Sequence, residues 1–149
     1  SNLIEEMQSI SLNPPIDPIE NTKFFVNNVA DTFEKDINFY RAALMSAEHL
    51  RLFDPTIPDG PFQQAQQLAT PNKKWYERGL LLGNIQPSII MEKVHNSNRL
   101  ARIDWVLGYI DLNQFRHQVM RGILLVYAAD ASPELHVLLI EEINRLNSL

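Results

Sequence analysis

The chain contains 149 residues, of which 45% are hydrophobic and 21% are charged, and it carries a formal net charge of −5. This composition is typical of one globular domain that can bury its own core. Because there is no cysteine, disulfides, thiolate nucleophiles, iron–sulfur clusters and cysteine-ligated zinc are excluded. No apolar run approaches the roughly 18–20 residues of a membrane-spanning helix, so we expect a soluble protein without a transmembrane segment.

The location and the domain limits are less constrained by these bulk properties. The lack of cysteine fits the cytoplasm or another reducing compartment, where we expect the chain to act. The chain begins at Ser1 without an initiator methionine, which indicates either a cloning scar or an excerpt of a longer protein. Secretion as part of a larger protein therefore stays open.

The first predicted helix is long and amphipathic. Asp17 is a suitable N-cap, Pro18 occupies the first helical position, and Glu20 follows three residues after the cap. Apolar residues then recur every three or four positions, which predicts one continuous helix from about 18 to 53. The stripe comprises Val26, Val29, Phe33, Ile37, Tyr40, Leu44 and Ala47, with Phe25, Phe39, Ala43 and Leu50 along one flank.

Residues on either side of this helix are predicted to break regular structure. Residues 1–17, which include "LNPPID", should form an extended or loosely helical arm. Three prolines and a glycine in "DPTIPDGP" predict a break at 54–61, because proline cannot continue a helix. A short helix over the glutamine-rich residues 62–69 is expected next, within a bundle domain that spans 18–149.

Four further helices are predicted in the second half of the chain. One begins at Thr70 and ends near Gly83, with Gly79 and Gly83 permitting close approach of a neighbouring helix. A second begins at Pro87 and turns inward a stripe that comprises Ile90, Val94, Ala101, Trp105 and Gly108.

The last two predicted helices begin at clear capping residues. Asp111 and Gln114 form a capping box that starts a helix of about 112–129, and Ser132 caps the final one. The helix of about 112–129 is apolar nearly all round after Gly122, which predicts a central position. No segment shows the alternation of a strand. The expected fold is therefore all-α, a single-domain bundle of five to seven helices.

A Glu and a His three residues apart on the helix after Pro87 raise the question of a metal site. Glu92 and His95 have the spacing that some four-helix bundles use to hold half of a di-metal centre. At about 100° per residue both lie far from the inner stripe, in the same sector as Arg99 and Arg102, and no second half is present. We therefore expect solvent-facing residues, and no metal, cofactor or catalytic residue is identified.

Two acidic residues fall on predicted apolar faces. Asp36 lies inside the apolar arc of the first long helix, and Glu142 inside that of the last helix. A carboxylate on a core face has to be paired or protonated, and a structural salt bridge to Arg51 or Arg121 is the expected solution. The alternative is that these faces are a contact surface left open for a partner.

Basic residues are concentrated in the middle of the chain. Residues 1–70 carry a net charge of −6, residues 71–121 carry +4, and residues 122–149 carry −3. This pattern fits an acidic helix packed beside a basic one, or else a patch for an anionic partner. The candidate contact residues are Lys73, Lys74, Trp75, Arg78, His95, Arg99 and Arg102, with Trp75 and Tyr76 as an aromatic platform.

Three functional hypotheses follow, and no sequence motif decides among them. The first is a non-enzymatic helical protein–protein interaction module, such as an adaptor, a chaperone-like factor, or a scaffold or effector domain whose partner is another protein. The second is a binder of an anionic ligand, a lipid headgroup or nucleic acid, through the basic segment 73–102. The third is a small helical enzyme whose unrecognised site includes Asp36, Glu142 and a histidine. The oligomeric state is not predicted.

Overall fold

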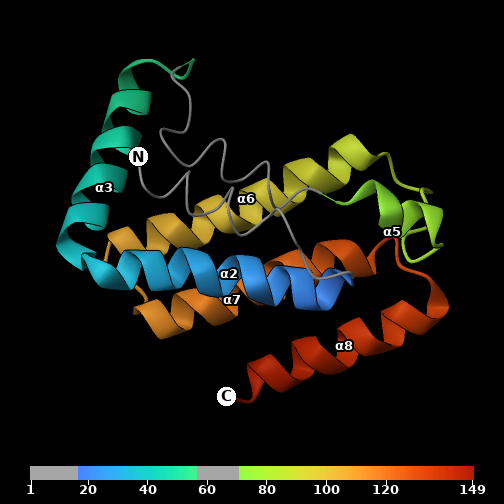
Figure 1. The fold of residues 1–149 in the computed structure, drawn as a ribbon. Coiled ribbons are helices and arrows are strands. Elements are labelled where there is room, and N and C mark those ends of the chain that lie inside the picture. The colour runs from blue at the N-terminus through green and yellow to red at the C-terminus, as the bar shows by residue number, and fades with distance from the viewer. Residues whose placement is uncertain (1–16, 57–70) are drawn as a thin grey trace.

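A computed structural model describes residues 17–56 and 71–149, and this part of the chain is entirely helical apart from turns and one isolated β-bridge. The predicted all-α, single-domain bundle is confirmed (Figure 1). The arm 1–16 and the glutamine-rich segment 62–69 lie outside the described residues. The helices are α2 (Pro18–Lys35), α3 (Ile37–Phe53), α5 (Lys73–Glu77), α6 (Pro87–Val106), α7 (Leu112–Ala128) and α8 (Pro133–Asn147).

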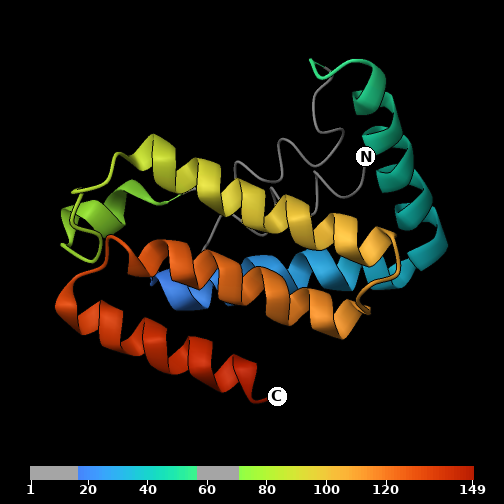
Figure 2. The same ribbon diagram turned by 180° about the vertical axis from the view of Figure 1, so that it is seen from behind.

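Helix α7 is the centre of the bundle, as its apolar sequence predicts. It packs against α2, α6 and α8, and Figures 1 and 2 show it between these three helices in both views. Its buried side chains include Phe115, Ile123 and Tyr127. Gly122 allows α6 to come close, because a Cβ added there would lie 2.9 Å from the Cβ of Ser97.

The helix ends agree with local capping chemistry. The side chain of Asp17 accepts a hydrogen bond from the Glu20 amide at 2.9 Å, and the Asp111–Gln114 pair forms a complete capping box. Ser132 caps α8 through the Leu135 amide. These side chains satisfy backbone N–H groups that have no partner within their helices, and so they fix where each helix begins.

The prediction of one continuous helix from 18 to 53 is wrong, because the chain turns at Asp36. Asp36 has φ −155° and ψ 78°, ends α2, and caps α3 by accepting a hydrogen bond from the Phe39 amide at 3.2 Å. A short acidic side chain competes for nearby backbone N–H groups and so favours a cap over a helix interior. Helix α3 consequently leaves the end of α2 at a steep angle and stands beside α6, at the edge of the molecule in both views (Figures 1 and 2).

The segment that was expected to be helical from 70 to 83 contains only one short helix within its described residues. Asn72 caps α5 through the Lys74 amide, and the chain then turns at Gly79 and Gly83, whose φ values are 71° and 78°. Positive φ is the conformation that glycine adopts without strain. The expectation that these two glycines bring helices together is therefore wrong, since the close approach occurs at Gly122 instead.

Asp130, which follows α7, holds the turn after α5 through hydrogen bonds. The buried carboxylate of Asp130 accepts hydrogen bonds from the amides of Gly83, Asn84 and Ile85 at 2.9, 3.0 and 3.3 Å. The carbonyl of Asp130 accepts a further bond from the Leu82 amide at 2.8 Å. These four hydrogen bonds to backbone amides link two segments that lie far apart in the sequence.

Candidate functional site

Residues Glu92 and His95, which raised the metal question, do not form part of a metal site in the described structure. Glu92 is exposed and His95 is partly buried on α6. Within residues 17–56 and 71–149, no group of three or more His, Asp or Glu side chains is placed to hold a metal ion.

The basic residues of the middle segment are not brought together in one patch. Lys73, Lys74 and Arg78 are exposed on α5 and the turn after it, whereas Arg99 is on α6. Arg99 lies twelve residues into that helix, which is roughly 18 Å along its axis from the end nearest α5. The segment 73–102 therefore presents two separate basic regions.

The predicted aromatic platform for an anionic ligand is also wrong. Trp75 is only 1% exposed and packs edge-on against Tyr127, with 5.5 Å between ring centroids. Tyr76 is partly buried, and burial together with the charge of Asp130 raises the pKa of its hydroxyl. Trp75 is thus a core residue and cannot stack on a ligand.

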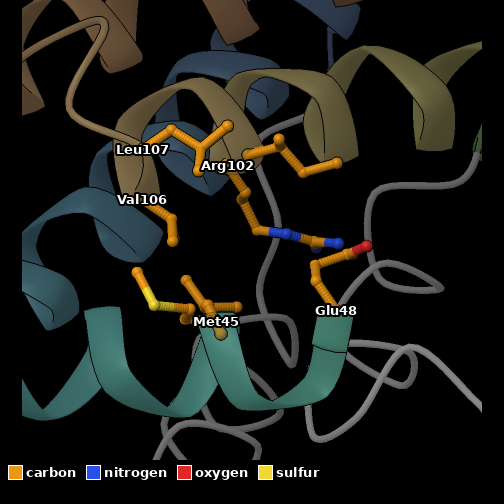
Figure 3. A pocket seen from close by; sticks show the side chains of 7 residues that line it. Met45, Glu48, Arg102, Val106 and Leu107 are labelled. Atoms are coloured by element: carbon orange, nitrogen blue, oxygen red, sulfur yellow. The ribbon is translucent and has the colours of Figure 1, made fainter. Parts of the chain in front are cut away.

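The junction of α3 and α6 gathers the charged residues that were expected to face solvent. Glu48 of α3 binds Arg99 of α6, with 2.8 Å between its Oε2 and Nη2, and binds Arg51 at 3.3 Å. Arg102 is 3% exposed, and its guanidinium points toward the Glu48 carboxylate (Figure 3). The expectation that Arg102 faces solvent is wrong, because α3 covers this sector of α6.

A small open cleft lies at the same junction. It contains about 360 Å³ of empty space, part of which is open to solvent, and its walls are mostly apolar with charge at one end (Figure 3). Neither Asp36 nor Glu142 borders it. The lining residues are Leu44, Met45 and Glu48 from α3, Arg102, Ile103 and Val106 from α6, and Leu107 after it.

The acid on the last helix is paired, as expected, but with different partners. Glu142 binds Arg145 through two contacts of 2.6 and 3.0 Å and Lys23 of α2 at 3.5 Å. The hydrogen bonds from Arg145 are the largest cause that lowers the pKa of the Glu142 carboxyl. The expected partners Arg51 and Arg121 are not those that hold it.

The other acid, Asp36, is not on an apolar face. It is exposed and caps α3, so the prediction of a core carboxylate is wrong at this position. Asp36 comes thirteen positions after Lys23, the partner of Glu142, which is roughly 20 Å along the helix. The two acids therefore cannot act on the same substrate atom.

The outer flank of α3 exposes several large apolar side chains. Leu44 is the only buried residue among the 17 residues of this helix, although the helix is rich in large apolar side chains. We call the residues Phe39, Ala43, Ser46, Leu50 and Phe53 the α3 stripe. Its three large members are 60%, 51% and 78% exposed for Phe39, Leu50 and Phe53.

The α3 stripe has the spacing of a helix-packing surface. Its members follow one another at intervals of four, three, four and three residues, which places them on one face of the helix. The sequence contained this signal, since Phe39, Ala43 and Leu50 flank the predicted apolar arc. The prediction that they lie on the core is wrong, because the turn at Asp36 places this flank of α3 on the side away from the bundle.

Comparisons with protein-family models, with curated proteins and with solved structures found no match for this chain. No helix within the described ranges is both long enough and apolar enough to cross a membrane.

Proposed function

We propose that this chain is a helical protein–protein interaction module and that the α3 stripe is its contact surface. The observation that carries the proposal is the exposure of Phe39, Leu50 and Phe53 on one face of a helix. Single exposed apolar residues are ordinary, but large ones gathered along one stripe are typical of a partner site.

The cleft beside Met45 adds apolar surface next to this helix. Met45 lines the cleft on the opposite flank of α3 from the stripe, and it is half exposed. Methionine adapts its shape to different partners because its side chain is unbranched and flexible. A partner that packs against α3 would therefore contact apolar side chains on two flanks of the helix.

The alternative of an anion-binding surface receives less support. Its basic residues form two separate regions, and its aromatic platform is absent because Trp75 is buried. The enzyme hypothesis loses the pairing of Asp36 with Glu142 on which it depended. The interaction module is the hypothesis that accounts for the exposed apolar residues.

The test compares two sets of surface variants in affinity capture from a cell lysate. The stripe variant carries Phe39→Ser, Leu50→Ser and Phe53→Ser, and the control carries Val137→Ser and Leu138→Ser, which are also about half exposed on α8. We expect a stoichiometric partner to bind the wild type and the control but not the stripe variant. Equal capture by all three proteins, or by none, would contradict the proposal, provided that their thermal unfolding shows all to be folded.

A further inference from the structure

The junction between α2 and α3 consists of a single residue. Because α2 ends at Lys35 and α3 begins at Ile37, only Asp36 departs from helical geometry between them. The Asp36 N–H donates to the carbonyl of Phe33 at 3.2 Å, and its carbonyl accepts a hydrogen bond from the amide of Tyr40 at 3.1 Å. A change in the backbone angles at this one residue would therefore convert the bent chain into a continuous helix.

A continuous helix would form backbone hydrogen bonds that are missing at the bend. The first N–H groups of α3 have no acceptor within their own helix. In a straight helix, the amides of Ile37, Asn38 and Phe39 would each donate to the carbonyl four residues earlier. The straight helix would lose the bond of 3.2 Å from the Phe39 amide to the Asp36 carboxylate. The side chain of Asp36 is thus the local feature that favours the bend.

The apolar pattern is compatible with both forms. Phe33, Ile37, Tyr40 and Leu44 follow one another at intervals of four, three and four residues, which would place them on one face of a continuous helix. Local interactions therefore permit the straight form, and contacts of α3 with other helices favour the bent one.

The two helices differ in how much of their surface is buried. Helix α2 buries eight of its 18 residues, whereas Leu44 is the only buried residue among the 17 of α3. Burial of an apolar face is the main interaction that holds a helix in place within a protein. Helix α2 is thus the fixed side of the junction, and α3 is the side that can move.

Polar contacts contribute to the attachment of α3 to α6. The Nη2 of Arg41 donates to the carbonyl of Trp105 at 3.3 Å, and its guanidinium lies 5.3 Å from the centroid of that ring. Glu48 binds Arg99 at 2.8 Å, but 30% and 34% of these two side chains are exposed. Water and salt screen such a pair. A segment with few buried apolar residues opens more readily than the core does.

We infer that Asp36 is a hinge at which α3 moves away from α6 by joining α2 in one continuous helix. Helix α3 is then a lid on the C-terminal part of α6. The bent form brings together the two walls of the cleft at Met45 and Val106 (Figure 3), and the straight form separates them and uncovers Leu44. This motion does not depend on the proposed function, because the α3 stripe is exposed whether or not α3 moves.

A distance measurement between two spin labels tests the hinge directly, since the chain has no cysteine of its own. The labels are attached to Leu52→Cys on α3 and Asn96→Cys on α6, both at exposed positions. In the bent form, the ion pair between Glu48 and Arg99 keeps this part of α3 beside α6. In the straight form, α3 would extend past the end of α6, and the labels would be roughly 40 Å apart at 1.5 Å per residue.

Two substitutions should shift the chain toward the straight form. Asp36→Ala removes the cap and favours a helix, whereas Asp36→Asn keeps a capping side chain and is the matched control. We expect the wild type and the asparagine variant to show mainly the short distance. The fraction at the long distance should be about five times larger in the alanine variant, the factor that corresponds to a typical cap. Arg41→Gln, which weakens the contact with Trp105, should also raise it.

Three outcomes would overturn the inference. One is the short distance alone in every variant, with thermal unfolding showing that all are folded. Another is equal opening of the Asp36→Ala and Asp36→Asn proteins, because the cap would then not control the bend. The third is a loss of helical circular dichroism that accompanies opening, since a straight helix keeps the 17 residues of α3 helical whereas an unravelled α3 does not.

Discussion

Replacing Asp130 by alanine should detach the turn after α5 from the rest of the bundle. The Asp130 carboxylate is 2% exposed and accepts hydrogen bonds from the amides of Gly83, Asn84 and Ile85. Among the described residues, Asp130 is the side chain that accepts hydrogen bonds from these three amides. Removal of the carboxylate therefore leaves all three without their acceptor.

The expected loss of stability follows from the number and the kind of these bonds. A hydrogen bond to a charged acceptor contributes about 1.5–3 kcal/mol, and a neutral one about 1 kcal/mol. Because Gly83 and Asn84 are exposed residues, water can replace part of what is lost. We expect Asp130→Ala to lower the free energy of unfolding by about 2–4 kcal/mol, a large part of the roughly 5–15 kcal/mol of a typical domain.

The asparagine variant separates the charge from the geometry. In Asp130→Asn one oxygen remains an acceptor, but the NH₂ group faces an N–H donor. Its effect should therefore fall between the wild type and the alanine variant. Asp31→Ala is a suitable control, because Asp31 pairs with Arg116 at 2.6 Å but is 61% exposed, and exposed pairs contribute about 1 kcal/mol or less.

Urea unfolding and amide hydrogen exchange measure the two consequences. Urea unfolding gives the change in stability, and exchange should accelerate at Gly83, Asn84 and Ile85 before it does in α7. A stability within about 0.5 kcal/mol of wild type, with unchanged exchange at these amides, would refute the reasoning that Asp130 holds the turn.

Three further predictions concern the helix junctions and one ion pair. Asp36→Ala should lower the free energy of unfolding by about 0.5–2 kcal/mol through loss of the α3 cap, whereas Asp36→Asn should lower it much less because asparagine also caps. Urea unfolding of the two variants measures this difference, and equal losses would contradict the prediction. Gly122→Ala should lower the free energy of unfolding by about 1–2 kcal/mol despite the better helix propensity of alanine, because its Cβ would lie 2.9 Å from that of Ser97. Thermal unfolding should show that adding Ser97→Gly to this variant relieves part of the loss. Because the pKa of Glu142 is lowered in the fold, its contribution to stability is present above the ordinary value of 4.5 and is lost as the pH falls through the lower folded value. Glu142→Gln should therefore weaken the protein at pH 7 and flatten the acid limb of its stability curve, while Glu141→Gln, at an exposed neighbouring position, should leave both unchanged.

Features that depend on contacts within a few residues were determined by the sequence alone. Asp17, Asp111 and Ser132 cap the helices that they were expected to begin, because a capping bond joins groups only two or three residues apart. The apolar pattern of α7 likewise predicted its central place, since a helix that is apolar nearly all round has to be surrounded.

At Asp36 two local features of the sequence favour different structures. The apolar stripe continues in register through this residue, so periodicity favoured one long helix, whereas the acidic side chain favoured a cap. Both signals were present in the sequence. Packing against distant helices decided between them, since Phe33 at the end of α2 stacks on Trp105 of α6 at 4.9 Å while α3 turns away.

The partners of charged residues were decided only by the tertiary structure. Arg102 is buried because α3 covers its side of α6, and Glu142 is paired with Lys23 from the opposite end of the sequence. A helical wheel gives the angle between two residues of one helix, but it carries no information about which other helix covers each sector. The same limit applies to the α3 stripe. Its spacing is visible in the sequence, but it is exposed because α3 lies at the edge of the bundle.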